Sequence, residues 1–138
     1  MDESTEKKCD FSDMGLSDAW LFRFKFYEEN GIPKVFKQTD KYVKNFKSLP
    51  FKSQMTMAMN WKAFFFGPFY YFYLGMWRKA LTILLFLTVL DLLLILLLSK
   101  AAAGCCYAIF WAVMTNPIYY VHRTKKSKSF NPFEGMQL

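Results

Sequence analysis

The chain has 138 residues, of which 54% are hydrophobic, 20% aromatic and 21% charged, and its formal net charge is +7. This length allows one domain at most, and the hydrophobic fraction is high for a soluble domain of this size. Charge and apolarity are separated: residues 1–62 hold eleven of the eighteen Lys and Arg residues, residues 80–99 hold one charge, Asp91, and residues 101–121 hold none. This separation is typical of membrane proteins with one basic face.

The N-terminal segment, residues 1–15, is expected to be a disordered tail, because it is polar and has no hydrophobic period. It also lacks the apolar segment of a secretory signal peptide, so we expect the N-terminus to stay in the cytoplasm. A cytoplasmic region of amphipathic helices is predicted to follow over residues 16–59.

The first of these helices is predicted over residues 18–29. Ser17 is a suitable N-cap, three aromatic residues follow at helical spacing, and Asn30-Gly31 is a stop signal. The alternation of apolar and charged residues in LFRFKFY would also suit a strand.

A second helix is predicted between Pro33 and Pro50, because five lysines step by three or four residues and share one helical face. Apolar residues such as Tyr42 and Phe46 share the opposite face. These two faces suit the surface of an anionic membrane, and they suit equally a helix packed on the protein with its lysines in water. Nucleic-acid binding is not expected, since the basic residues adjoin apolar segments. The lysines are Lys34, Lys37, Lys41, Lys44 and Lys47, and residues 51–60 are expected to be a connector.

A membrane domain is predicted over residues 60–122. Residues 80–99 carry a single charge, and at about 1.5 Å per residue a helix of this length crosses the roughly 30 Å hydrocarbon layer. Residues 101–121 are predicted to form a second transmembrane helix, which Pro117 should kink or end. Since Lys100 and a few small residues separate the spans, we expect a tight antiparallel hairpin.

The preceding segment, residues 60–79, is dominated by aromatic residues: they are ten of the seventeen residues from Trp61 to Trp77, and Gly67-Pro68 interrupts them. A helix over residues 63–77 reaches only about 23 Å, and Trp and Tyr favour the headgroup level of a bilayer. The Gly-Pro pair is a natural break. We therefore predict an aromatic re-entrant or interfacial hairpin on the cytoplasmic side.

The distribution of basic residues favours two spans over three. With three spans and a cytoplasmic N-terminus, twelve Lys and Arg residues would lie inside and six outside, whereas two spans place seventeen inside and only Lys100 outside. The positive-inside rule therefore predicts an all-α membrane protein with two transmembrane helices. Both termini would be cytoplasmic, including a basic tail over residues 123–138.

The segment NWKAFFFGPFYYFYLGMWRKAL, Asn60–Leu81, resembles the signature of a bacterial family of small inner-membrane proteins catalogued as domain of unknown function 2628. The two spans match this family only as hydrophobic segments, and residues 1–59 match it loosely. The resemblance implies a location in the bacterial inner membrane and implies no activity. The matching residues are Trp61, Ala63, Phe64, Phe65, Phe66, Gly67, Pro68, Tyr73, Met76, Trp77 and Arg78.

Asp91 is the candidate functional residue of the spans. A charged carboxylate at the centre of a transmembrane helix costs about 2.5–3.5 kcal/mol on insertion scales, so Asp91 should face the protein interior or be neutral. In a hairpin it would lie near Trp111 and Thr115, whose indole and hydroxyl groups are possible hydrogen-bond donors to it. Asp91 could be a proton or cation site, a contact to a partner's basic group, or a protonated residue that joins the two helices.

No catalytic triad, Gly-rich phosphate loop, pair of catalytic carboxylates or metal-spaced cluster occurs in the sequence, so neither an enzyme nor a cofactor is expected. The first interpretation is an accessory or regulatory inner-membrane protein that acts by interaction. Its expected partners are the bilayer with its anionic headgroups, and another membrane protein or a second copy. The alternatives are an immunity protein against a membrane-active bacterial toxin and an oligomeric ion or small-solute conduit.

Overall fold

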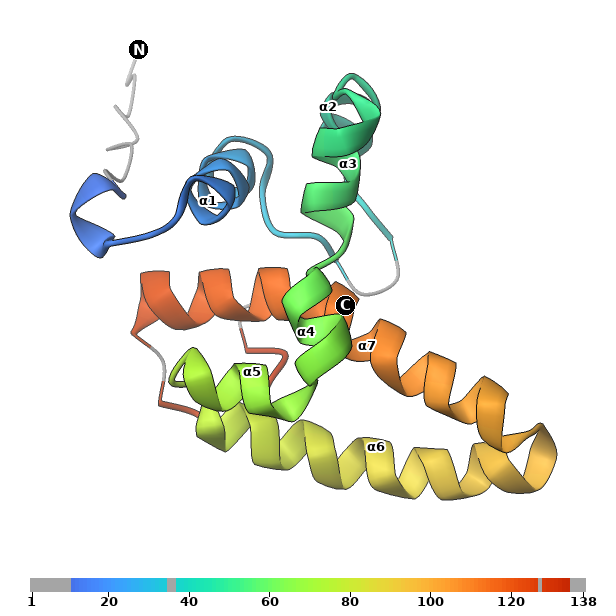
Figure 1. Cartoon of the computed structure of the whole chain (residues 1–138). Coiled ribbons are helices and arrows are strands. Elements are labelled where there is room, and N and C mark those ends of the chain that lie inside the picture. The colour runs from blue at the N-terminus through green and yellow to red at the C-terminus, as the bar shows by residue number, and fades with distance from the viewer. Residues whose placement is uncertain (1–10, 35–36, 127, 135–138) are drawn as a thin grey trace, which may run out of the picture.

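The computed structural model of the chain describes residues 11–34, 37–126 and 128–134, and all regular structure in these ranges is helical (Figure 1). The predicted all-helical class is therefore confirmed. The elements are a 3₁₀ turn η1 (Ser12–Met14) and the α-helices α1 (Asp18–Asn30), α2 (Asp40–Lys47), α3 (Phe51–Ala58), α4 (Trp61–Phe66), α5 (Pro68–Tyr73), α6 (Trp77–Leu97) and α7 (Lys100–Lys125).

The two longest helices, α6 and α7, pack against each other and run in opposite directions from the turn that joins them (Figure 1). Within the described ranges they are the two helices long and apolar enough to cross a membrane, by length and composition. Helix α4 packs on α7, α5 packs on α4 and α6, and α1 and α3 also contact α7. Helix α7 is thus shared by most layers of the molecule.

Several helix ends follow the signals in the sequence. Helix α1 begins after Ser17 and ends before Gly31, whose N–H donates to the Tyr27 carbonyl at 2.8 Å, so the strand alternative is excluded. Helix α7 is capped by Ser99, whose hydroxyl accepts from the Ala102 N–H at 3.2 Å. Helices α6 and α7 begin and end within a few residues of the predicted spans.

The predicted basic helix is shorter than expected. Helix α2 begins only at Asp40, so Lys34 and Lys37 precede it. Thr39 caps the helix by accepting from the Tyr42 N–H at 3.3 Å. The Gln38 side chain closes the preceding loop, because it donates to the Lys34 carbonyl at 2.7 Å and accepts from the Lys34 N–H at 3.1 Å. Local side-chain bonds to the backbone therefore win over helical propensity before Asp40.

Two other expectations differ from the structure, and one of the two alternatives for Pro117 is excluded. The predicted connector 51–60 is largely helical, as α3. Residues 1–10 of the predicted disordered tail lie outside the described residues, but Phe11 is 3% exposed and its ring lies 5.4 Å from that of Phe24. Pro117, predicted to kink or end the second span, lies inside α7 and does not end it, and the ribbon of α7 changes direction along its length (Figure 1). Buried surroundings on the second half of α7 stabilise the helix past the proline.

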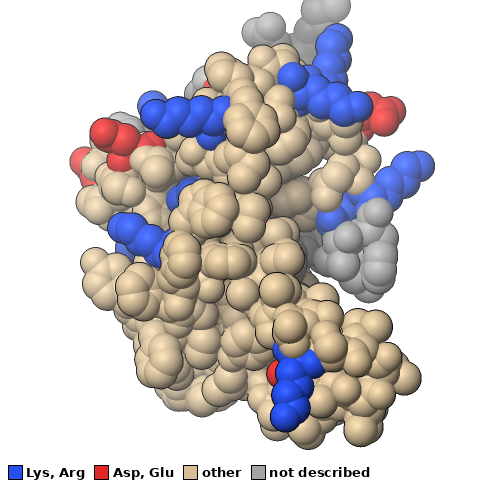
Figure 2. All heavy atoms as spheres, turned by 45° about the vertical axis from the view of Figure 1, so that its right-hand side comes forward, with Lys and Arg blue, Asp and Glu red and all other residues tan. Residues whose placement is uncertain are grey.

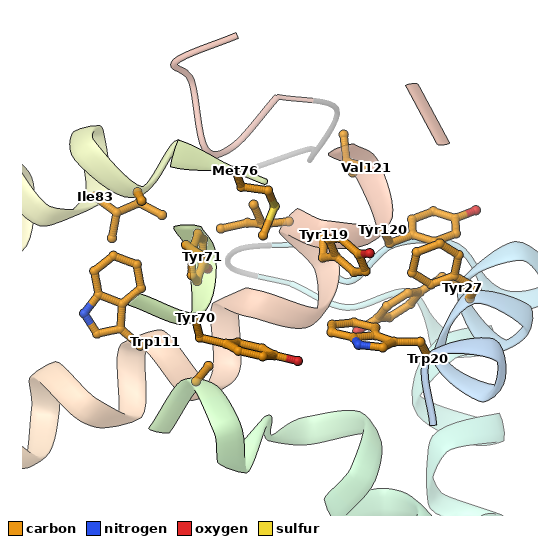
Figure 3. Close-up of a cluster of buried hydrophobic side chains, with 14 of the residues drawn as sticks. Trp20, Tyr27, Tyr70, Tyr71, Met76, Ile83, Trp111, Tyr119, Tyr120 and Val121 are labelled. Carbon is orange, nitrogen blue, oxygen red and sulfur yellow. The ribbon is translucent and has the colours of Figure 1, made fainter. Parts of the chain in front are cut away.

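The core lies where the second half of α7 meets α1, α5 and the start of α6. Figure 3 shows Tyr119 and Tyr120 beside Trp20 and Tyr27 at one end, and Trp111 beside Tyr71 at the other. The Trp20 and Tyr119 ring centroids are 4.5 Å apart, and those of Tyr71 and Trp111 are 4.8 Å apart. Tilted and edge-to-face contacts of this kind stabilise aromatic cores beyond the area that they bury.

The outer face of α6 has the opposite character. Only 17% of its most apolar stretch is buried in the protein, and long aliphatic side chains cover the rest. A soluble monomer rarely exposes an apolar patch of this extent. Exposed members include Leu85, Val89, Leu92, Leu93, Leu96 and Leu97.

Replacement of Phe24 by Ala should destabilise the fold by about 3–5 kcal/mol, because its fully buried ring fills the junction of η1, α1 and α7. The matched control is Phe65→Ala, whose ring is 74% exposed and should cost far less. Denaturant unfolding in an uncharged detergent measures both changes. Equal losses for the two variants would contradict this core.

Candidate functional site

The aromatic segment forms a two-sided layer made of α4 and α5. The helices meet at Gly67, where φ is +52° and ψ is −126°, a conformation that favours glycine. One side of the layer faces the core through Ala63, Tyr70 and Tyr71. The other side is exposed, and it consists of Trp61, Phe65, Phe66, Phe69, Phe72 and Tyr73.

Gly67 also lies against α7. A Cβ atom at this position would be 3.7 Å from Cδ1 of Trp111, which is an ordinary van der Waals contact, so the break between α4 and α5 lies directly beside the indole. Trp111 is fully buried, and Tyr71 of α5 packs edge-on against it. The family motif residue Gly67 and the candidate residue Trp111 therefore meet at one point.

Asp91 does not make the two expected hydrogen bonds. The Thr115 hydroxyl donates instead to the Trp111 carbonyl, and the Trp111 indole nitrogen has no hydrogen-bond partner in the part of the chain that the structure describes. Asp91 is partly exposed and continues the spacing of Ala80, Ile83 and Leu87, the buried stripe of α6. Its role as a site or as a link between helices remains a hypothesis.

A pair of asparagines, to which the sequence analysis assigned no role, joins the N-terminal helices to α7. The Asn116 amide nitrogen donates to the Met57 carbonyl at 2.9 Å, and its oxygen accepts from the Asn60 amide at 3.3 Å. The Asn60 N–H donates to the Ala112 carbonyl at 2.8 Å, and its side chain caps α4 by accepting from the Ala63 N–H. The sequence does contain a signal for this contact: Asn116 lies within an apolar segment, and a buried side-chain amide needs hydrogen-bond partners.

Arg23 is a second buried polar group that sequence reasoning missed. Its Nε donates to the Thr56 carbonyl at 2.8 Å, and its guanidinium lies 4.6 Å from the centre of the Trp20 ring. Burial lowers the pKa of Arg23, while the nearby Tyr27 and Tyr70 oppose this change. Arg23 thus links α1 to α3, and its guanidinium group stabilises the contact between these two helices.

The last residues of the family motif meet the C-terminal segment. Arg78 donates from Nη1 to the Lys128 carbonyl at 2.7 Å, and its guanidinium carbon lies 5.2 Å from the Trp77 ring and 5.4 Å from the Phe130 ring. The Trp77 and Phe130 rings pack edge-to-face at 6.0 Å. Residues 128–130 are therefore held against the start of α6, and Met76 is buried beside them.

The five lysines of the predicted basic face do not all share one helix. Lys41, Lys44 and Lys47 lie on α2 and are exposed, while Lys37 is exposed in the loop before it and Lys34 is half-buried. The remaining family-motif residues, Phe64 and Pro68, are half-buried at the two sides of the α4–α5 break.

The chain matches the model of a family described as protein of unknown function, DUF2628, over residues 3–125. The chain belongs to this family. It is 37% identical over 114 residues to the uncharacterized protein YigF of Escherichia coli K12, a match that covers 83% of this chain and 90% of that protein. The YigF protein of Salmonella typhimurium LT2 is 33% identical over the same shares of the two chains. No solved structure matches the chain.

Replacement of Gly67 by Ala should destabilise the protein by about 1–3 kcal/mol, because the added Cβ is strained at this backbone conformation. The control is Gly104→Ala in α7, where a Cβ meets nothing within 4 Å and helical propensity improves. Thermal unfolding followed by circular dichroism should show a lower midpoint for the first variant only. A neutral Gly67→Ala would show that the break does not depend on glycine.

Proposed function

We propose that this chain is a non-enzymatic integral protein of the bacterial inner membrane that acts by interaction with other membrane components. The observation that supports this function most directly is the exposed aliphatic face of α6, because water does not favour so large an apolar surface. The absence of a catalytic signature in the sequence is consistent with an accessory or regulatory role.

In the proposed arrangement α6 and α7 cross the bilayer as a hairpin. Figure 2 supports this arrangement: most charged side chains lie over the part formed by α1–α3, whereas the part formed by α6 and the first half of α7 is almost uncharged. Asp91 and Lys100 are the charges between residues 80 and 121. Lys100 stands at the turn and would emerge on the outer side, opposite the basic ends of the chain.

The exposed side of α4 and α5 would extend the lipid-facing surface. The second half of α7 is covered by protein, so this part of the helix exposes little apolar surface to lipid, whereas α6 exposes apolar surface along its length. Outward rings such as Phe65, Phe69 and Tyr73 lie next to it and suit the boundary between headgroups and acyl chains. This placement corresponds to a re-entrant or interfacial hairpin that does not cross the membrane.

The α1–α3 unit would lie on the cytoplasmic surface. Its exposed lysines Lys37, Lys41, Lys44 and Lys47 can face an anionic leaflet, where each is worth up to about 1 kcal/mol. Bonds from Asn60 and Asn116 connect this unit directly to α7. A protein bound to the cytoplasmic unit could therefore sense the position of the membrane helices.

Reporter fusions test the topology. Alkaline phosphatase, active only outside the cytoplasm, should be inactive when fused after Lys79 or Asn30 and active when fused after Ser99, because two spans place only the α6–α7 turn outside. A fluorescent protein that matures in the cytoplasm should give the opposite pattern. Phosphatase activity after Lys79 would show that residues 60–79 cross the membrane and would overturn the two-span arrangement.

Site-specific photocrosslinking tests the interaction. A photoreactive residue that replaces Leu92, which is 61% exposed, should form one crosslinked product in native membranes. This product should contain either another membrane protein or a second copy, in a fixed ratio to this chain. The same residue at Leu87, 4% exposed and on the buried stripe of α6, is the matched control and should form none. Adducts with lipid alone at Leu92 would contradict an interaction through this face.

A further inference from the structure

A basic pocket lies at the start of α6. It has a volume of about 310 Å³ and is formed by the first turn of α6, the end of α7 and residues 128–129. Its lining includes three residues with cationic side chains, Arg78, Lys79 and Lys128, together with His122, and no acidic residue. Such a concentration of positive charge in one hollow favours an anionic ligand.

Lys79 is the decisive residue of this pocket. It is 1% exposed, and its Nζ has no hydrogen-bond partner in the ranges that the structure describes. Lysine is almost never fully buried without a partner, because an isolated ammonium group is costly to remove from water. The geometry points to a bound phosphate group as the missing partner, and we propose that an anionic phospholipid supplies it.

The backbone around Lys79 suits this ligand. Helix α6 has 21 residues and no side chain caps its start, so the N–H groups of its first turn and the positive end of its dipole face the same region. Gly75 lines the pocket and has a φ of +80°, a conformation in which the chain turns just before the helix. Backbone donors and Lys79 can therefore act on one phosphate.

The C-terminal segment forms one side of the pocket. The bond from Arg78 to the Lys128 carbonyl, with Phe130 packed on Trp77, holds this segment against the start of α6, where Lys128 and Ser129 line the pocket. Glu134 of the same segment is the acidic residue whose charge acts on Lys79. Glu134 does not line the pocket, but its negative charge opposes the approach of an anion to Lys79, so removal of this charge should strengthen binding.

A neighbouring apolar pocket favours a lipid over a free phosphate. This second pocket, about 380 Å³, is lined by Ile83, Phe86, Phe110, Phe130 and Phe133 among others. Ile83 follows Lys79 by one helical turn on α6, and Phe130 follows the Lys128–Ser129 lining of the first pocket. A headgroup at Lys79 would thus continue into an acyl chain along α6, as in basic sites between membrane helices that bind anionic lipids.

The test uses the full chain purified in an uncharged detergent, with lipid binding followed by native mass spectrometry. The probes are phosphatidylglycerol, phosphatidylcholine with the same acyl chains, and inorganic phosphate as a competitor. The variants are Lys79→Met, which keeps the buried stem, and Lys62→Met, the control with the same charge change at an exposed position. Circular dichroism verifies that each variant is folded, and Glu134→Gln tests the pocket without any change to Lys79.

We expect phosphatidylglycerol to bind more tightly than phosphatidylcholine, and Lys79→Met to weaken it at least about tenfold, as for loss of a charged hydrogen bond. Lys62→Met should leave the affinity unchanged, and Glu134→Gln should raise it. Equal binding of the two lipids, or unchanged phosphatidylglycerol binding in Lys79→Met, would overturn the proposal. If Lys79→Met does not fold, a Glu134→Gln variant with unchanged affinity overturns it.

Inorganic phosphate separates the two sources of the ligand. If inorganic phosphate displaces phosphatidylglycerol only weakly, the preferred ligand is the lipid. If phosphate binds as tightly as the lipid and this binding needs Lys79, the pocket is a phosphate site and the lipid is not its preferred occupant. The choice of a phospholipid over free phosphate rests on the proposed membrane location, whereas the anion site itself does not. A chain that fails the topology test but binds phosphate through Lys79 would overturn the proposed function and leave the site intact.

Discussion

The structure depends on the second half of α7, because the other layers of the molecule meet on it. Its residues from Trp111 to Val121 are nearly all buried, yet the centre of this stretch is the polar pair Asn116 and Thr115. Apolar contacts alone would let neighbouring helices slide, whereas the bonds from Asn116 to Met57 and Asn60 have fixed partners and directions. Loss of either partner would leave a buried amide unsatisfied, so these bonds fix the register between the cytoplasmic helices and α7.

The residues of the family motif form part of the contact with the second half of α7, and most of them precede the two long apolar helices. Ala63 is fully buried and Gly67 lies against Trp111, so α4 and the break before α5 are in contact with α7. The outward rings of the same motif, such as Phe65, Phe69 and Tyr73, are largely exposed on the surface that the structure describes. One short segment therefore has two tasks, since its buried residues pack in the core and its outward rings meet the surroundings of the protein.

The sequence predicted the elements with strong local signals. Ser17 and Gly31 bound α1 as expected, and the hydrophobic stretches on either side of Lys100 are the two long helices. Expectations failed where particular contacts, local or distant, override the pattern in the sequence. The regular lysine spacing did not extend α2, because the Gln38 side chain bonds to the backbone of Lys34. The asparagine pair and Lys79 depend on contacts between remote segments, which periodicity does not report.

The contacts between α1 and α7 also bear on how the protein is made. Tyr120 donates to the Glu28 carboxylate across 92 positions of sequence, and Arg123 donates to the Met14 carbonyl across 109. During synthesis the N-terminal helices emerge first, and the helix that completes their core, α7, emerges only after α2 to α6. Rings such as Trp20 and Phe24 therefore stay without their partners Tyr119 and Tyr120 until α7 has been made, which leaves apolar surface of α1 exposed on the nascent chain.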